Sequence, residues 1–178
     1  YYVDLTPATS DVYIGGTGGA SRAWRTVLIG GSRAGARGLF ALDVTNPANF
    51  SETNASNMVL WEFTHPDLGY ITEPPLIVMA PWGNGDYRWT ALVGNGYNSG
   101  SGKTGIFMID LEGGLDGSWT SGTDYRFINF ENSGGTGLSA VTAVDLTGNR
   151  IIDRIYGGDL KGNMWGAEYS SNSWSSIV

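Results

Sequence analysis

The sequence predicts an all-β fold, namely a β-propeller fragment with about three four-stranded blades of a larger ring. Two observations lead to this prediction. The 178 residues include 28 glycines, and the segments between them are short and apolar, with seven Trp, nine Tyr and six Phe to supply buried area. A strand–turn–strand pattern also recurs three times along the chain, as expected for propeller blades.

The recurring unit is a strand that ends in glycine, a turn, and a second strand that ends in an acidic residue. Its three copies are Thr26–Gly31 with Gly38–Asp43, Thr90–Gly96 with Gly105–Asp110, and Arg154–Asp159 with Gly162–Glu168. The matching glycines, Gly30, Gly94 and Gly157, lie 64 and 63 residues apart. In the first copy we expect Thr26–Gly31 to pair antiparallel with the strand that begins at Gly38.

Flanking strands complete each predicted blade. Those before the hairpins are Tyr1–Leu5, Pro75–Ala80 and Ser139–Asp145, and those after them are Val59–Phe63, Tyr125–Phe130 and Trp174–Val178. The blades therefore span about residues 1–64, 70–131 and 137–178, with no helix. Long loops at 46–57 and 81–88 account for a period above the ~40–50 residues of common blades. A ring needs at least ~4 blades, so we expect an internal fragment of a longer protein.

Charge and composition exclude several classes of function. Ten basic and 17 acidic residues give a net charge of −7 without a basic stripe, so nucleic acid is a poor partner. The chain has no cysteine and therefore no disulfide and no thiolate metal site. No apolar run reaches the ~18 residues that a membrane-spanning helix needs.

The sharpest motif is the segment from Asp145 to Asp153, which has the spacing of a calcium loop. Oxygen-bearing side chains at loop positions 1, 3, 5 and 9, with a backbone carbonyl at position 7, match the first nine positions of an EF-hand loop. The predicted ligands of Ca²⁺ are Asp145, Thr147, Asn149, the Ile151 carbonyl and Asp153. A polar turn whose Asp and Asn side chains bind backbone donors remains the alternative.

The loop departs from the EF-hand pattern in three ways. Arg150 replaces the glycine of position 6, Tyr156 replaces the glutamate of position 12, and Thr147 replaces a carboxylate. With only two carboxylates, we expect weak binding. The glycine-rich turn from Pro81 to Asp86 occupies the corresponding place in the second blade, but its oxygen ligands are too few and too poorly spaced for a metal.

Nothing in the chain predicts catalysis, so we expect no enzyme. His65 is the single histidine, and no Gly-x-Ser-x-Gly nucleophile elbow occurs. The segment Gly94–Thr104 misses the phosphate-loop spacing by one residue and joins two strands, so we expect a hairpin loop. Trp82 and Tyr97, which we place in loops, are candidates for a recognition surface.

Several blocks together resemble the PilC/PilY family of type IV pilus biogenesis factors. In chain order they are Trp24–Gly31, Gly35–Thr45, Leu60–Phe63, Asp67–Tyr70, Val93–Ser99 and Tyr156–Trp165. The resemblance runs through nearly the whole chain. It implies a modified, quinoprotein-like β-propeller at the C-terminal end of a large exported protein, located at the outer membrane, the cell surface or the pilus tip.

The resemblance also implies a function. Such proteins support pilus assembly, oppose retraction, and contribute to adhesion and twitching motility, with pilus components such as minor pilins and host or surface receptors as partners. It implies a calcium loop that controls this balance, matched here at Asp145, Asn149, Ile151 and Asp153, whereas Thr147 departs from the family pattern. The Arg-Gly-Asp sequence of some members is absent.

Two alternatives from other classes remain open. A piece of a quinoprotein dehydrogenase propeller would share the Ala-Leu-Asp and Trp-Glu-Phe fragments, although the repeats here are longer and the vicinal cysteines of many such enzymes are missing. A carbohydrate-binding propeller would use Trp82 and Tyr97.

Overall fold

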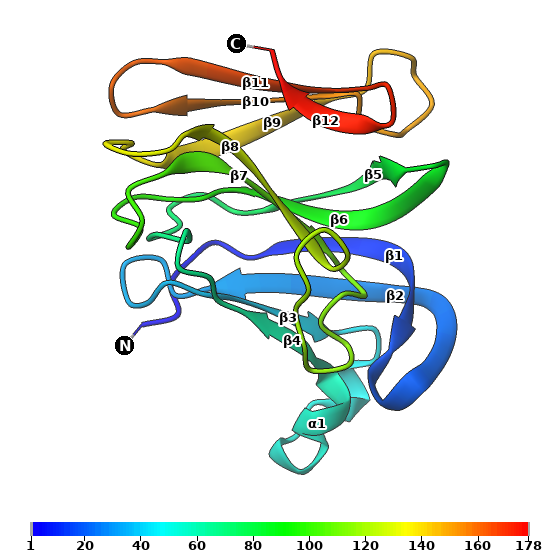
Figure 1. Cartoon of the computed structure of the whole chain (residues 1–178). Helices are drawn as coiled ribbons and strands as arrows, with labels where there is room; N and C mark the ends of the chain where they lie inside the picture. The colour runs from blue at the N-terminus through cyan, green and yellow to red at the C-terminus, as the bar shows by residue number, and fades with distance from the viewer. Residues whose placement is uncertain (1, 178) are drawn as a thin grey trace.

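The computed structural model describes residues 2–177 and contains three four-stranded antiparallel sheets, which lie one above another as layers (Figure 1). The first sheet, ordered β1-β2-β3-β4, consists of β1 (Ala8–Gly16), β2 (Ala20–Gly31), β3 (Leu39–Asp43) and β4 (Val59–Phe63). The predicted all-β propeller fold is confirmed, and β2 pairs antiparallel with β3 from Val27 with Asp43 to Gly31 with Leu39, as expected.

The other two sheets repeat this order. The second contains β5 (Leu76–Gly83), β6 (Asp86–Gly94), β7 (Thr104–Asp110) and β8 (Tyr125–Glu131). The third contains β9 (Leu138–Val144), β10 (Arg154–Asp159), β11 (Met164–Ser170) and β12 (Ser173–Ser176). Within every sheet each strand pairs with its neighbour in sequence, which is the arrangement of propeller blades.

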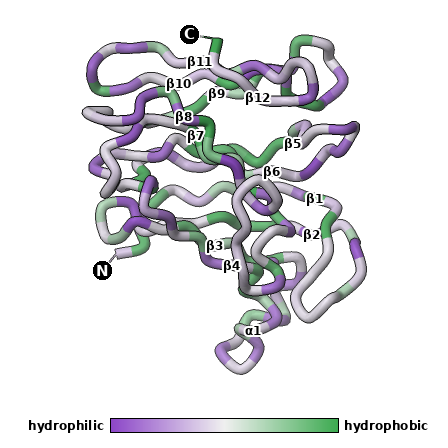
Figure 2. Tube along the Cα trace, viewed as in Figure 1, coloured by the Kyte–Doolittle hydropathy of each residue, from purple (hydrophilic) through white to green (hydrophobic). Residues whose placement is uncertain are grey.

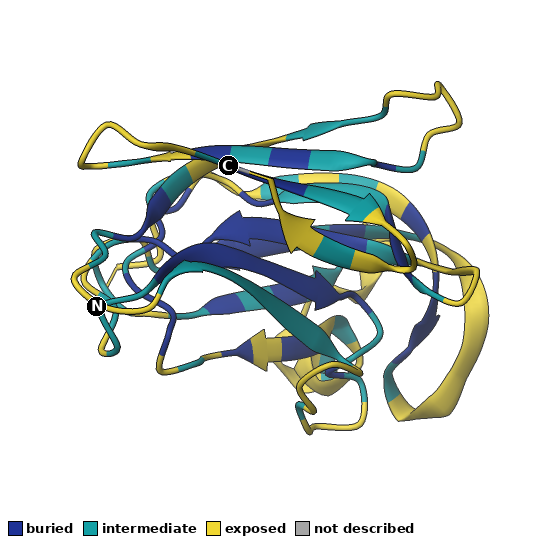
Figure 3. Ribbon diagram, turned by 45° about the horizontal axis from the view of Figure 1, so that its top comes forward, coloured by how far each residue is buried: buried dark blue, intermediate teal, exposed yellow. Residues whose placement is uncertain are grey.

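The second sheet is buried on both faces because it lies between the other two. On β6, Ala91 and Val93 belong to the core shared with the first sheet, whereas Leu92 belongs to the core shared with the third. All seven residues of β7 are buried, and its side chains alternate between the same two cores. The apolar segments accordingly lie mainly in the strands (Figure 2), and exposure concentrates in the connections between them (Figure 3).

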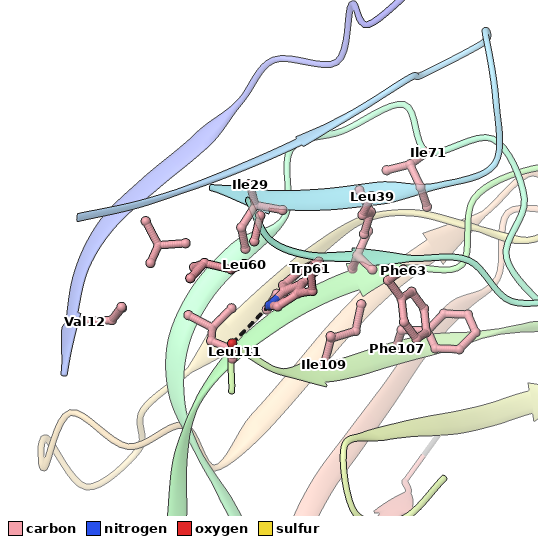
Figure 4. Packing of buried hydrophobic residues seen from close by; sticks show 14 of the residues in the cluster. Val12, Ile29, Leu39, Leu60, Trp61, Phe63, Ile71, Phe107, Ile109 and Leu111 are labelled. Atoms are coloured by element: carbon pink, nitrogen blue, oxygen red, sulfur yellow. Dashed lines mark hydrogen bonds between the residues drawn. The ribbon is translucent and has the colours of Figure 1, made fainter. Parts of the chain in front are cut away.

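Aromatic side chains join neighbouring sheets. The buried Trp61 donates its indole N–H to the carbonyl of Leu111 at 3.0 Å, across the core between the first and second sheets (Figure 4). Trp174 donates to the Pro81 carbonyl at 2.9 Å, and Trp165 stacks on Phe130 with ring centroids 5.5 Å apart. Each contact supplies both apolar area and, for the two indole donors, a hydrogen bond.

An arginine–carboxylate pair recurs in each sheet and explains the acidic end of the repeat. The second strand of each sheet supplies the arginine and the third supplies the acid. The pairs and their N–O distances are Arg25–Asp43 at 2.6 Å, Arg88–Asp110 at 2.9 Å and Arg154–Glu168 at 2.7 Å. Arg154 lies directly opposite Glu168, whereas Arg25 and Arg88 each lie two residues from the position opposite their acid. Each pair joins opposite charges on adjacent strands, which stabilises the hairpin.

Two predicted segments differ from the structure. The first strand is Ala8–Gly16 rather than Tyr1–Leu5; Tyr1 lies outside the described residues, and Leu5 is a buried residue whose N–H bonds to the Gly31 carbonyl. The predicted loop at 81–88 is mostly strand, since β5 and β6 are separated only by a tight turn at residues 84 and 85. The strand before the turn, β5, is a nearly continuous apolar run, and β6 begins with alternating polar and apolar residues. Sequence reasoning overlooked these patterns in favour of the glycines.

The connection at 46–57 is partly helical rather than an irregular loop. It holds two 3₁₀ turns, Pro47–Asn49 and Glu52–Asn54, and the short helix α1 (Ala55–Met58). The Asn46 side chain accepts the Ala48 N–H at 3.0 Å, and proline opens the first turn, so ordinary capping signals start it. Among the described residues, no helix has the length and apolar character needed to cross a membrane.

Candidate functional site

The predicted calcium loop connects β9 to β10 at one end of the third sheet. Its backbone turns through two residues with positive φ, Gly148 at 75° and Arg150 at 68°. Glycine adopts this region without steric cost, whereas Arg150 requires local hydrogen bonds to hold it there. The side chain of Asp145 supplies them.

Asp145 organises the whole turn through its carboxylate. Its Oδ1 accepts the backbone N–H of Gly148 at 2.7 Å, together with longer bonds from Thr147 and Asn149, and its Oδ2 accepts the Arg150 N–H at 2.6 Å. Desolvation, the largest effect, raises the pKa of Asp145, but the four backbone donors together outweigh it and lower this pKa below its usual value. The loop therefore favours the charged carboxylate.

Asp153 closes the loop and connects it to the neighbouring strands. Its Oδ2 accepts the Leu146 N–H at 2.7 Å, while its backbone N–H bonds to Val144 and its carbonyl accepts the N–H of Tyr169. No hydrogen bond from a described residue reaches Asp153 Oδ1. This oxygen keeps free acceptor capacity on the loop.

The residue between two of the predicted ligands joins the third sheet to the second. Ile152 donates its N–H to the Met79 carbonyl at 3.0 Å, and Ile151 forms a parallel bridge with Met79. The Ile152 side chain is buried in the core between these sheets. The loop is thus part of the contact between two blades.

The donor set fits a hard cation with low affinity. Asp145 Oδ2 has one backbone donor and Asp153 Oδ1 has none, so both carboxylates keep lone pairs, and the Asn149 amide, the Thr147 hydroxyl and the Ile151 carbonyl add neutral oxygens. Within residues 2–177, no three His, Cys, Asp or Glu side chains gather as a metal site would gather them. The loop has only two carboxylates, and Arg150 opposes their charge.

Of the two residues predicted to form a recognition surface, Trp82 lies elsewhere than expected, whereas Tyr97 lies in a connection between strands, as expected. Trp82 belongs to β5 and is 4% exposed. Its ring lies between the guanidinium groups of Arg88 and Arg126, and its N–H bonds to Thr90 at 2.9 Å. Trp82 therefore cannot contact a partner, because the turn that we took for a long loop is strand. Tyr97 is half-buried and forms an isolated antiparallel bridge with Tyr70.

His65 lies in an aromatic environment between the first two sheets, with no serine nucleophile among its contacts. Its ring stacks on Phe63 and meets the edges of Phe107 and Tyr125 at 5.2 and 5.3 Å, while its Nδ1 accepts the Asp67 N–H. Burial, the largest effect, lowers the pKa of His65, and Lys103 adds to this, whereas Asp67 acts in the opposite direction. These contacts are those of a packing residue.

Asn95, which sequence reasoning missed, joins the β4–β5 connection to the second and third sheets. Its amide N–H₂ donates to the carbonyls of Asp67 and Lys103, and its Oδ1 accepts the N–H groups of Gly105 and Leu138, all between 2.9 and 3.1 Å. The side chain is completely buried. The Gly-Asn-Gly sequence carried this signal, because glycines on both sides of a polar residue permit close backbone approach.

The segment Gly94–Thr104 is a connection between β6 and β7, as predicted, and its lysine is engaged. The Lys103 ammonium lies 3.0 Å from the Asp67 carboxylate. At the other glycine-rich turn, Asn84 exchanges two hydrogen bonds with Asn172, so this turn connects the second sheet to the third.

The chain is similar to characterised proteins over nearly its full length. Residues 1–174 match the family model described as the PilY1 beta-propeller domain. A type IV pilus biogenesis factor PilY1 homolog of Xylella fastidiosa is 40% identical over 176 residues, which cover 93% of this chain and 11% of that protein. The PilY1 of Pseudomonas aeruginosa strain PAO1 is 39% identical over 93% of this chain and 12% of its own length.

A solved structure shows the same fold. The crystal structure of the Pseudomonas aeruginosa PilY1 C-terminal domain matches with a TM-score of 0.68 and 37% identity. The match covers 94% of this chain and 30% of that domain chain. The chain thus spans about an eighth or less of the curated relatives named above and under a third of the solved domain.

Proposed function

Because this chain belongs to the PilY1 β-propeller domain family, we propose that it is a calcium-responsive module of a type IV pilus biogenesis factor. In this proposal the module acts without catalysis in an exported protein at the outer membrane, cell surface or pilus tip. It supports pilus assembly, opposes retraction, and contributes to adhesion and twitching motility. Its partners are pilus components such as minor pilins, and host or surface receptors.

One observation supports a calcium response in particular: the loop's predicted ligands flank an inter-blade hydrogen bond. The Ile151 carbonyl and the Asp153 carboxylate lie on either side of Ile152, whose N–H bonds to Met79 in the second sheet. A bound cation supplies positive charge that holds carboxylate and carbonyl oxygens at fixed positions. Residues 151 and 153 would then hold Ile152 against Met79 and stiffen the contact between the second and third blades.

The affinity should be low. Two carboxylates, one amide, one hydroxyl and one carbonyl give about five protein oxygens where Ca²⁺ takes 6–8, so water must complete the shell. We expect a dissociation constant of about 10⁻⁴–10⁻³ M, in the range of extracellular modules. Mg²⁺ should compete poorly, since it requires a small and nearly ideal octahedral shell.

Piliation of cells that carry Asp153→Ala tests the functional proposal. We expect fewer surface pili and less twitching than in the wild type, because retraction would be insufficiently opposed. Deletion of the retraction motor in the same cells should restore the pili. Asp153→Lys should restore them partly without that deletion, since its ammonium lies where the ion would bind.

Asp116→Ala is the matched control. Asp116 is an exposed acid whose carboxylate also accepts a backbone N–H two residues on, at Ser118, but it lies in the connection between β7 and β8. Pilus number should stay normal in this variant. Normal piliation in Asp153→Ala, or a loss that persists without the retraction motor, would contradict the proposed role.

A further inference from the structure

Exposed aromatic side chains gather in a cleft between the first two sheets, and none of the predicted calcium ligands is among the described residues that line it. Tyr13, Trp24 and Tyr87 are 48%, 64% and 53% exposed, and together with Trp89 and Met79 they line a cleft of about 370 Å³. Large aromatic surface in water is unfavourable, so its concentration in one concave place indicates a binding site.

The rings are held in place by the strands that carry them. Tyr13 and Trp24 are cross-strand partners in the part of the β1–β2 ribbon that extends past β3, and their centroids lie 5.8 Å apart at an angle of 61°. Trp24 meets Trp89 of β6 at 6.4 Å and 68°. These edge-to-face contacts restrict the motion of Trp24, which is still 64% exposed.

Paired charges form the rim of the cleft. Arg22 donates two hydrogen bonds to the Glu112 carboxylate, at 3.1 and 2.6 Å, and Glu112 also accepts the Gly15 N–H. Arg88 is bound by Asp86 and Asp110. The guanidinium of Arg22 keeps further N–H donors, and no charge among these residues is left without a counter-charge.

We propose that this cleft binds a pyranose ring of a neutral glycan. The apolar C–H face of the sugar stacks on Trp24, and its hydroxyls bond to the remaining donors and acceptors of Arg22 and Glu112. A charged peptide fits less well because each of these rim charges is already engaged by a counter-charge.

Calorimetric titration of the purified full-length protein with neutral oligosaccharides tests the proposal. The probes are glucose oligomers with β-1,4 and α-1,4 links and β-1,4-linked N-acetylglucosamine oligomers, at up to millimolar concentrations. At least one series should bind saturably, and Trp24→Ala should weaken that binding by at least about tenfold. Tyr87→Ala, on another wall of the cleft, provides a second variant in case Trp24→Ala folds poorly.

Two controls separate this site from other effects. Leu160→Ala removes a side chain of the third sheet that is equally exposed, at 66%, and should bind the sugar as the wild type does. Asp153→Ala should also bind normally, so that failure of the calcium proposal and failure of this one are distinguishable. Absence of saturable binding to all three series, or unchanged affinity in folded Trp24→Ala and Tyr87→Ala, would overturn the proposal, as would binding of a charged peptide at the cleft in place of sugar.

Discussion

At the scale of single residues, the buried side chain of Asn95 makes more than one connection between distant segments of the chain. Four hydrogen bonds from one buried amide join the β4–β5 connection, the β6–β7 connection and the start of β9. An amide is the only side chain of this size and shape that supplies both donors and acceptors here. A substitution that keeps the shape of the side chain and removes its N–H donors therefore measures what these donated hydrogen bonds contribute to stability.

We predict that Asn95→Asp lowers the free energy of unfolding by about 3–5 kcal/mol. The carboxylate would place a buried charge against the carbonyl oxygens of Asp67 and Lys103, which lose their donors. Urea denaturation measures the change. Asn132→Asp, at an exposed position, is the control and should change stability by less than about 0.5 kcal/mol. Equal effects of the two substitutions would contradict the assigned role of Asn95.

His65 should make stability depend on pH in a range that is separate from the range in which the carboxylates titrate. Its pKa is lowered in the folded protein, so the unfolded chain binds the proton more readily and stability falls as the pH drops below about 6.5. The charged groups near the ring are Asp67 and Lys103, and the ring of Tyr125 also contacts it.

Urea denaturation between pH 7 and 5 measures this dependence. The variant His65→Asn keeps a nearby acceptor for the Asp67 N–H but does not titrate, so its stability should be flatter across this window. Asp67 affects the pH dependence of stability only at a more acidic pH than His65 does, because the pKa of Asp67 is lowered below the usual value of a carboxyl group. Equal pH dependence of wild type and variant would show that another group is responsible.

At the scale of elements, the strand pattern was predictable because apolar alternation and turn residues act locally. The hairpin β2–β3 and the strands β4, β7 and β8 follow from alternation and from glycines at their ends. The first strand was misplaced because Tyr1–Leu5 and Ala8–Gly16 are both short and partly apolar, and only pairing with β2 selects the second. The turn at residues 84 and 85 was taken as a long loop because glycine is as common in tight turns as in loops.

The candidate site was predictable only in its spacing. Alternate oxygens from Asp145 to Asp153 follow directly from the sequence, whereas the bond from Ile152 to Met79 depends on how two blades stack. Trp82 illustrates the same limit, since burial between Arg88 and Arg126 requires two other strands to be in place. Long-range contacts of this kind have no local signature.

One of the close backbone approaches between the second and third sheets is at Gly137. Gly137 has a φ of 79°, and a Cβ there would overlap the carbonyl oxygen of Gly96. Gly117 has nearly the same φ, 80°, but nothing lies near its missing Cβ. Comparing the same substitution at the two glycines therefore separates the cost of backbone strain from the cost of steric overlap.

We predict that Gly117→Ala costs about 1–2 kcal/mol of stability, from the left-handed backbone alone. Gly137→Ala should cost more than about 4 kcal/mol, because backbone must move as well. Thermal unfolding of both variants measures the difference. Similar losses would mean that the strands β6 and β9 approach each other less closely than the structure shows.

At the scale of the whole molecule, neighbouring sheets share apolar cores, and polar contacts also join them. Between the second and third sheets these include Ile152 with Met79, Trp174 with Pro81 and Asn84 with Asn172. A face of the first sheet also stays apolar outside these two cores, where it forms a groove. The groove is lined by Leu28, Leu42, Val44, Phe50, Met58 and Val59. Because the bond from Ile152 to Met79 belongs to the predicted calcium loop, a cation bound there would change how firmly the second and third sheets are joined.

Amide hydrogen exchange at Ile152, with and without Ca²⁺, tests directly whether Ca²⁺ stiffens the contact between the second and third blades. Calcium should slow exchange of the Ile152 N–H together with that of Leu146 and Arg150, because the loop would then open less often. The N–H of Gly69, which bonds to Asn95 at the other end of the stack, should exchange at the same rate in both conditions. Asp153→Ala should abolish the calcium effect. Exchange at Ile152 that is unchanged by millimolar Ca²⁺ in the wild type would contradict the account.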